Sequence, residues 1–382
     1  MSLVFSEEQR ILKDTAKEFV AEHAPVAALR KLRDDVNPDG FDRSLWHAMT
    51  ELGWPGVLVD EAYGGVEFGF KGLGAVLEET GRTLTASPLL STALIGATLI
   101  GRLGTETQKK QWLGKIASGE MITALAFEES PHHAPERVAL QATATPEGYV
   151  LDGSKGFVLD GHVADLLLVV ARTSGASDET NGISVFAVPA DAPGVAISRT
   201  FMVDSRNAAN LTLSRVPAND ANLLGGPAAL GKARFALDYT LDLARIGLCA
   251  EMLGSLSEAF DRTMDYLKTR EQFGALIGSF QGLKHRAAEM FSEIELSRSV
   301  VMEALDAVER DDDDLPLLAS LAKAKVSDTF HTVSSEAIQM HGGIGMTDDE
   351  EIGFFIKRAR VAEQTFGDAK YHRNRYARLS GF

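Results

Sequence analysis

Residues 270–281 read Arg270-Glu271-Gln272-Phe273-Gly274-Ala275-Leu276-Ile277-Gly278-Ser279-Phe280-Gln281 and form a turn-prone insertion between two stretches of helical spacing. The insertion gathers a guanidinium, an amide and two aromatic rings. Arg suits bidentate contact with a pyrophosphate, and aromatic faces can cover an adenine or a flavin ring. The pattern therefore indicates a loop that holds a nucleotide-containing cofactor.

A second motif follows at residues 339–345 and reads Gln339-Met340-His341-Gly342-Gly343-Ile344-Gly345. Three glycines close together allow a backbone to approach a ligand at short range. Glycines after a helix are also ordinary C-caps, so this motif alone has a structural explanation as well. The two motifs are therefore interpreted together.

Outward from these motifs, the spacing of apolar residues changes twice along the chain. Helical spacing runs from residue 6 to about 120, and it returns after about 226, where one apolar stripe is longest. That stripe consists of Leu283, Ala287, Met290, Ile294, Val301 and Leu305. Between these parts, short β-rich runs alternate with turns, at residues 149–151, 166–170, 183–188, 195–198 and 211–213.

These changes predict three domains. An N-terminal helical domain is expected over residues 1–120, a middle β domain over 121–225 and a C-terminal helical bundle over 226–382. Helix, then strand, then helix, without alternation, argues against a doubly wound α/β sheet. Long amphipathic helices such as those of the last part usually pack in a bundle. The predicted fold class is mostly α with a central β domain.

The composition excludes several classes of protein. The 382 residues are 45% apolar and 24% charged, as in a globular protein, and no run approaches the roughly 18 apolar residues that a membrane span needs. The formal charge of −16 argues against a nucleic-acid partner, because such binding needs clustered Lys and Arg. Glu7 and Glu8 stand where a signal peptide would be apolar, so a cytoplasmic location is expected. The single Cys249 excludes an internal disulfide and is expected to be a small core residue.

Three short matches to other kinds of site fail on inspection. Gly226-Pro227-Ala228-Ala229-Leu230-Gly231-Lys232 has P-loop spacing, but Ala233 stands where a Ser or Thr should reach Mg²⁺. Gly72-Leu73-Gly74 lacks the strand and the third glycine that a nicotinamide-dinucleotide turn requires. The pair His132-His133 lacks Cys or carboxylate partners at metal-ligand spacing. No metal site is predicted.

Together and in this order, the two C-terminal motifs resemble those of the acyl-CoA dehydrogenase family. The resemblance covers nearly the whole chain, since Tyr63-Gly64-Gly65 and Gly104-Thr105-Glu106-Thr107-Gln108-Lys109 look like family segments. Gly153-Ser154-Lys155-Gly156-Phe157, with Ala164-Asp165, looks like the middle-domain signature. The resemblance implies a helical domain, a small β-barrel domain and a four-helix bundle, assembled as a homo- or hetero-oligomeric dimer or tetramer.

The resemblance also implies an activity, a cofactor and partners. The implied activity is α,β-dehydrogenation of an acyl-CoA thioester in fatty acid or steroid side-chain degradation, with FAD at a subunit interface and an electron-transfer flavoprotein as acceptor. The phosphate and adenosine half of FAD is assigned to the residues that match family positions, namely Arg270, Gln272, Phe273, Phe280, Gln339 and Gly343. Phe157 falls where an aromatic residue flanks the flavin.

The part of the pattern that concerns catalysis departs from the family. Most members place a Glu base in a Glu-Gly-Thr turn near the C-terminus, and the matching residues here are Phe366-Gly367-Asp368. A minority place it directly before the first arginine of the C-terminal helices, and that position is Ala244. The segment Phe127-Glu128-Glu129-Ser130-Pro131 replaces a stretch that bonds the flavin edge in the family, and Leu159 replaces a Thr or Ser.

Three interpretations follow from the missing base. The chain is an active dehydrogenase whose base is displaced to a residue such as Asp368 or Glu363. It is instead a base-less subunit that completes the FAD site of a catalytic partner in a heteromeric dehydrogenase. It is, in the third interpretation, a flavin-dependent monooxygenase, which needs no base. No particular acyl group is predicted, because the depth of the acyl pocket depends on tertiary packing.

Overall fold

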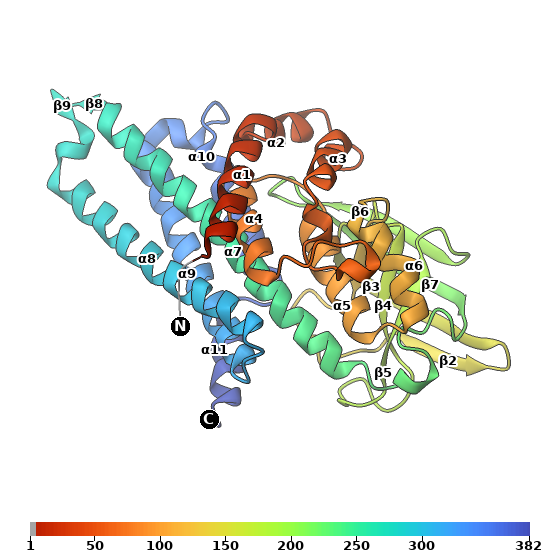
Figure 1. The fold of residues 1–382 in the computed structure, drawn as a ribbon. Coiled ribbons are helices and arrows are strands. Elements are labelled where there is room, and N and C mark those ends of the chain that lie inside the picture. The colour runs from red at the N-terminus through yellow and green to blue at the C-terminus, as the bar shows by residue number, and fades with distance from the viewer. Residues whose placement is uncertain (1–4) are drawn as a thin grey trace. The chain divides into compact units, whose positions relative to one another are not determined.

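The computed structural model describes residues 5–382, and the chain divides into two compact units (Figure 1). The first unit contains the described residues through Asp35, together with Phe70–Thr85 and Arg245–Phe382. The second unit contains Val36–Gly69 and Ala86–Ala244. The long helix α7 (Arg234–Thr269) begins in the second unit and ends in the first.

The first unit is helical apart from one short hairpin. Besides most of α7, its α-helices are α1 (Glu7–His23), α2 (Val26–Asp34), α4 (Phe70–Arg82), α8 (Gln281–Glu309), α9 (Leu315–His341), α10 (Ile352–Gln364) and α11 (Ala369–Leu379). The hairpin consists of β8 (Glu271–Gln272) and β9 (Ala275–Leu276), and the short helices η5 (Ile277–Ser279) and η6 (Gly342–Met346) complete the unit.

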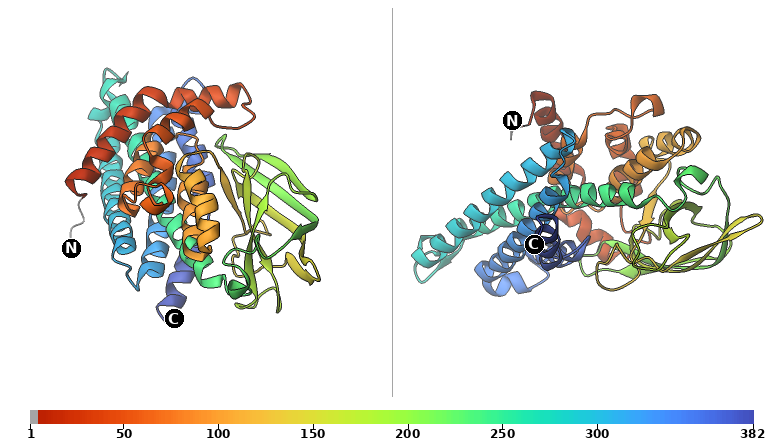
Figure 2. Two further views of the ribbon diagram at one scale, coloured as in Figure 1. Left: turned by 45° about the vertical axis from the view of Figure 1, so that its right-hand side comes forward. Right: turned by 90° about the horizontal axis from the view of Figure 1, so that it is seen from below.

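The apolar stripe predicted on residues 283–305 packs α8 into this unit. Met290, Ile294, Val301 and Leu305 are buried, whereas Leu283 and Ala287 are half-buried near the start of the helix. Helix α8 packs on α9, and α10 and α11 also pack on α9 (Figure 2). The rings of Phe260 on α7 and Phe291 on α8 lie 6.2 Å apart, so α7 runs beside α8. Burial of such stripes is the main source of stability for helices of this length.

A buried ion pair joins two helices of the first unit. Glu251 on α7 accepts hydrogen bonds from Arg358 on α10, at 2.9 Å from Nε and 2.8 Å from Nη2. The side chains of Glu251 and Arg358 are only 5% and 9% exposed. Removal of either partner would take a buried charge out of a desolvated ion pair, which is strongly destabilising.

The second unit combines short helices with one large sheet. Its helices are α3 (Arg43–Glu51), η1 (Trp54–Gly56), η2 (Glu61–Tyr63), the π-helix η3 (Leu89–Gly96), α5 (Ala97–Leu103), α6 (Glu106–Ala117) and η4 (Pro227–Ala229). Its strands are β1 (Thr123–Ala126), β2 (Gln141–Thr145), β3 (Gly148–Leu159), β4 (Leu166–Arg172), β5 (Ile183–Pro189), β6 (Val195–Phe201) and β7 (Asn207–Ala218).

The seven strands of this unit form a single curled sheet. The order is β1-β4-β2-β3-β7-β6, and β5 pairs with β4. Strand β4 runs parallel to β1 and β2, whereas the β2–β3, β3–β7, β4–β5 and β6–β7 pairs are antiparallel. Inward-facing residues such as Leu151, Val169, Phe186 and Leu211 form a common core. Each of the five predicted β-rich runs lies within one of the observed strands.

The predicted fold class, mostly α with a central β domain, is confirmed. The domain limits at residues 120 and 225 stay a prediction, because the two compact units divide the chain elsewhere and group Phe70–Thr85 with the long helices. Gly72-Leu73-Gly74 lies inside α4 and not in a phosphate-binding turn. Cys249 is buried, as expected of a core residue, and burial raises its pKa to about 12.

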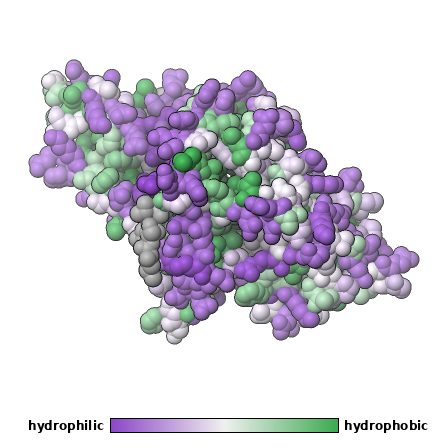
Figure 3. Space-filling view, in the orientation of Figure 1, coloured by the Kyte–Doolittle hydropathy of each residue, from purple (hydrophilic) through white to green (hydrophobic). Residues whose placement is uncertain are grey.

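One face of the described residues is largely polar. Hydrophilic residues dominate the face in Figure 3, in keeping with the acidic composition. Over residues 5–382, no helix combines the length and the hydropathy that crossing a bilayer requires.

Candidate functional site

The β8–β9 hairpin presents a phenylalanine at a strained turn. Glu271 pairs with Leu276 and Gln272 with Ala275, so Phe273 and Gly274 form a two-residue turn. Their φ angles are 55° and 75°, and two successive positive φ values are the requirement of a type I′ turn. Asn or Gly is the usual first residue of such a turn, and a bulky side chain there is strained. Phe273 is nevertheless 95% exposed, so burial within the described chain does not explain this conformation.

The polar and aromatic groups of residues 270–281 are available to a ligand. The ring of Phe280 precedes α8 and meets the ring of Phe273 edge-on, with centroids 6.3 Å apart. Arg270 is exposed, and within residues 5–382 its guanidinium has no hydrogen bond or ion pair. Gln272 is exposed too, and within the described part of the chain its side-chain amide donates only to the neighbouring Glu271 carbonyl, at 2.8 Å.

The glycine motif forms the open end of α9. Gln339 is exposed in the last turn of the helix, which ends at His341, and Gly342 follows as the C-cap with a φ of 66°. Gly343 is exposed, and apart from its own atoms and those of its two chain neighbours, no described atom lies within 4 Å of the position that a Cβ would take there. The backbone of Gly342 and Gly343 is therefore accessible to a ligand.

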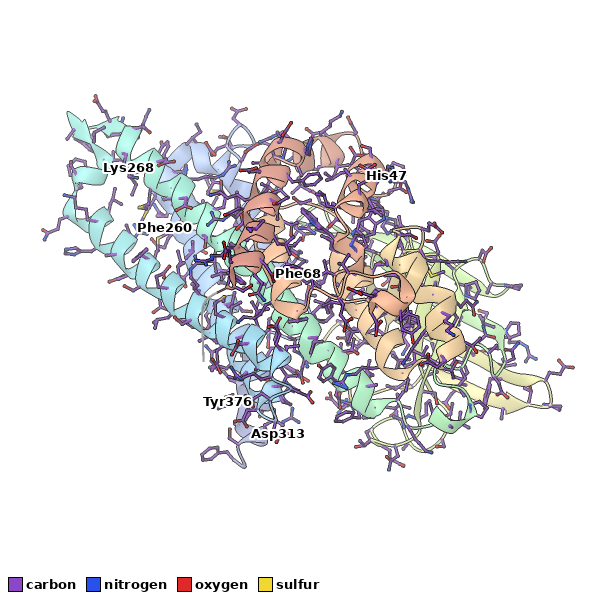
Figure 4. The ribbon with its side chains drawn as sticks, viewed as in Figure 1. His47, Phe68, Phe260, Lys268, Asp313 and Tyr376 are labelled. Carbon is purple, nitrogen blue, oxygen red and sulfur yellow. The ribbon has the colours of Figure 1, made fainter. Side chains whose placement is uncertain are left out.

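A ring stack brings the two motifs together. Tyr266, one turn before Arg270 on α7, stacks on His341 with ring centroids 4.5 Å apart and an angle of 23° between the planes. The Nδ1 atom of His341 donates to the Ala337 carbonyl at 2.8 Å, which fixes the ring on α9. Figure 4 marks Lys268 at the hairpin end of α7, and hydrophobic atoms emerge at this end in Figure 3. The hairpin and the glycine motif thus share one end of the first unit.

Phe157 belongs to the second unit and lies at a bulge in β3. The register of β3 against β7 shifts between Lys155 and Val158, and Phe157 has a φ of 50°. Its backbone N–H donates to Asn210 Oδ1 at 3.3 Å, and its side chain is 48% exposed. The bulge turns this ring outward, away from the sheet core.

The segment beside Phe157 contains two engaged carboxylates. Glu129 accepts from Lys155 Nζ at 2.6 Å and from the backbone N–H groups of Ala139 and Leu140 at 2.7 and 3.0 Å. Burial lowers the pKa of Lys155 to about 8, although the Glu129 carboxylate opposes this shift. Glu128 pairs with His133, a carboxylate partner that sequence spacing did not suggest. Among the described residues no group of three His, Cys, Asp or Glu side chains could hold a metal ion, and the absence of a metal site stays a prediction.

The two positions where a base is expected carry no acid. Ala244 is fully buried in α7, in the second unit. Phe366, in the first unit, is 5% exposed and has a φ of 59°. The carboxylate of Asp368 caps α11, with Oδ1 accepting from the Tyr371 N–H at 2.8 Å. Glu363 bonds His331 at 3.1 Å and Arg360 at 3.3 Å. Both carboxylates near the turn thus have structural partners.

Sequence reasoning missed the basic residues beneath this turn. Lys323, Arg245 and His372 are all buried and donate hydrogen bonds to backbone carbonyls of the turn. One signal existed: Lys323 interrupts the apolar face of α9 formed by Ala319, Val326 and Phe330.

The residues at the end of the first unit fit the phosphate and adenosine half of a dinucleotide. An unpaired guanidinium suits a pyrophosphate, an exposed ring suits a purine, and open glycine backbone lets both approach. Nothing in this donor set suits a metal ion, which would need clustered carboxylates, imidazoles or thiolates. These groups therefore favour an organic cofactor with a pyrophosphate over a metal ion.

Protein-family models match most of the chain. An acyl-CoA dehydrogenase N-terminal domain matches residues 6–120, a middle domain matches 130–216 and a C-terminal domain matches 235–380. The probable acyl-CoA dehydrogenase YngJ of Bacillus subtilis (strain 168) is 31% identical over 384 residues, which cover 98% of either chain.

Solved structures of similar chains have the same fold. The ChsE4-ChsE5 complex from Mycobacterium tuberculosis contains a chain that superposes with a TM-score of 0.90 at 26% identity, over 100% of both chains. A variant of the Tcur3481-Tcur3483 steroid ACAD superposes with a TM-score of 0.87 at 33% identity, over 98% of both chains.

Proposed function

Since the chain belongs to the acyl-CoA dehydrogenase family of oxidoreductases, we propose that it binds FAD and takes part in the α,β-dehydrogenation of an acyl-CoA thioester. The observation that carries this proposal is the stack of Tyr266 on His341, which gathers the hairpin and the glycine motif at one end of a helical unit. FAD, when bound, supplies the hydride acceptor.

The adenosine half of the cofactor is assigned to residues of this shared end. Arg270 binds the pyrophosphate by charge-assisted hydrogen bonds, and Gln272 and Gln339 add neutral ones. Phe273 and Phe280 cover the adenine, and the bare backbone at Gly343 admits the ribose or phosphate. Phe157, whose outward-turned ring is half exposed, is assigned to the flavin ring.

Cofactor extraction tests this assignment. The purified protein is denatured and the released cofactor is identified by mass, after a visible spectrum has been recorded. FAD is expected, either in the isolated chain or after co-expression with its genomic neighbours. Recovery of FMN or NAD, with no FAD under any of these conditions, would refute the proposal.

A second candidate function is that of a base-less subunit in a heteromeric dehydrogenase. It is favoured by the side chains at the turn: Phe366 cannot accept a proton, Asp368 caps a helix and Glu363 is paired with Arg360. In this arrangement a partner chain supplies the base and this chain completes its FAD site. The flavin monooxygenase alternative is not favoured, because the relative YngJ is named a probable acyl-CoA dehydrogenase.

The partners follow from the same proposal. They are an acyl-CoA thioester, an electron-transfer flavoprotein as acceptor, and further subunits, identical or different, that cover the exposed hairpin end. Co-purification with a tagged chain, followed by mass measurement of the intact assembly, separates a homo-oligomer from a hetero-oligomer. A monomer under all expression conditions would contradict the subunit proposal.

A further inference from the structure

A buried lysine lies beneath the turn that follows α10. The side chain of Lys323, on α9, has no exposed surface. Its Nζ atom donates to Gly367 O at 2.9 Å, to Glu363 O at 3.0 Å and to Ser327 Oγ at 3.2 Å. All three ammonium protons therefore go to neutral oxygens, two of which are backbone carbonyls. Burial of a lysine is rare without such a full set of acceptors.

Two more basic side chains reach the same turn from other helices. Arg245 Nε, on α7, donates to Phe366 O at 3.2 Å, and His372 Nε2, on α11, donates to the same oxygen at 3.0 Å. Three basic residues from three helices thus converge on three carbonyls. We call Lys323, Arg245 and His372 the carbonyl clamp.

The clamp acts on a segment whose backbone is strained. Phe366 has a φ of 59° and Gly367 has a φ of 102°, so two successive residues are in positive-φ conformations. A bulky side chain is unfavourable there unless its surroundings enforce it. The clamp also satisfies carbonyls at the C-terminal end of α10, where helical hydrogen bonding stops and a positive charge is favoured.

We propose that Lys323 is a positioning residue, which with Arg245 and His372 fixes the 363–368 turn and so presents residue 366 in one direction. The local claim, that the clamp sets the conformation of the turn, stands without any assumption about catalysis. Its consequence for the reaction rests on the proposed function: the backbone that would carry a base is kept in place although the side chain there is Phe366.

Hydrogen exchange followed by mass spectrometry tests the clamp in the FAD-loaded protein. Lys323→Met keeps the length of the side chain and removes its donors. Amide exchange in a peptide covering residues 364–370 should speed up by about tenfold or more, as expected for the loss of hydrogen bonds to a charged donor. Peptides from α8 should exchange as in the wild type.

Lys325→Met is the matched control. Lys325 lies on the same helix, two residues on, and its ammonium pairs with Glu293 on α8 and not with the turn. This control should leave exchange at residues 364–370 unchanged. Equal exchange of that peptide in Lys323→Met and wild type would overturn the proposal, as would a uniform acceleration over the whole unit, which indicates only general destabilisation.

A second pair of variants keeps the test decisive if Lys323→Met does not fold. His372→Gln retains an N–H donor that can reach Phe366 O, whereas His372→Leu does not. Slow exchange at the turn should be kept in His372→Gln and lost in His372→Leu. Identical exchange in the two variants would contradict the clamp. FAD occupancy, measured in parallel, reports on the proposed function separately, because the residues assigned to the cofactor are not altered.

Discussion

Arg270→Ala is expected to weaken FAD binding without weakening the fold. Arg270 is exposed and its guanidinium has no partner among residues 5–382, so loss of this side chain should change the free energy of unfolding of the cofactor-free protein by less than about 0.5 kcal/mol. A hydrogen bond between charged groups contributes about 1.5–3 kcal/mol, and exposure to solvent favours the lower end of that range. The dissociation constant of FAD should therefore rise by roughly 10-fold and by no more than about 150-fold.

Lys268→Ala provides the control for this substitution. Lys268 lies two residues earlier on α7, carries the same charge and is 73% exposed, but it is assigned no contact with the cofactor. Both dissociation constants are measured by titrating FAD into the two cofactor-free variants and monitoring the quenching of flavin fluorescence, at low and at high salt. The difference between them should shrink with salt, because phosphate contacts are screened. Equal constants for Arg270→Ala and Lys268→Ala would refute the assignment of Arg270.

Three further outcomes are expected. With straight-chain acyl-CoA esters, the isolated chain should reduce an electron acceptor roughly 10² to 10⁴ times more slowly than a family member that has its base. Phe366→Glu should raise this rate, and Asp368→Asn, which keeps the helix cap, should not lower it. Rapid wild-type turnover that Asp368→Asn abolishes would instead establish Asp368 as a displaced base. Burial lowers the pKa of Lys323 from 10.5 to about 8, so the unfolded chain binds more protons between these pH values and the stability of the wild type should rise with pH there, relative to Lys323→Met, by at most about 1.4 kcal/mol per pH unit. Urea unfolding at pH 8 and 10 measures the stability difference between the two proteins, and a difference that is the same at both pH values would contradict this prediction. The charged or titratable groups that face the ammonium are Cys249, Arg245, Glu363 and Asp368. Glu251→Gln should lower the free energy of unfolding by about 3–5 kcal/mol, because it removes the negative charge from a buried, hydrogen-bonded ion pair. A loss below about 1 kcal/mol in the same assay would show that the pair is not desolvated.

The sequence predicts the helical and β-rich parts because their signals are local. The α8 stripe needs only the 3.6-residue period, and runs such as 166–170 and 183–188 are apolar enough to specify buried strands on their own. The β-bulge at Phe157 and the positive φ of Phe273 are not predicted, since each depends on how a strand pairs with its neighbour.

The candidate site likewise has a part that the sequence predicts and a part that it does not. The residues of the hairpin and the glycine motif are contiguous in sequence, so their chemical types alone indicate a ligand. The clamp is not contiguous, because Lys323 contacts carbonyls of residues 363 and 367 and a helical lysine is ordinarily expected in solvent. Asp368 had a recognisable signal, since an Asp before a helix is a common N-cap. An N-cap role for Asp368 is an alternative to its interpretation as a base.

At the Phe273 turn, the side chain that would best suit the backbone differs from the side chain that would best suit a ligand. Asn in place of Phe would suit the positive φ better and should stabilise the hairpin. The same change would remove the most exposed aromatic ring of the hairpin, which is the part assigned to the cofactor. Selection for thermal stability alone would therefore drift away from phenylalanine at this position. Phe273 at the tip of the hairpin therefore lowers local stability while it provides an exposed ring for recognition.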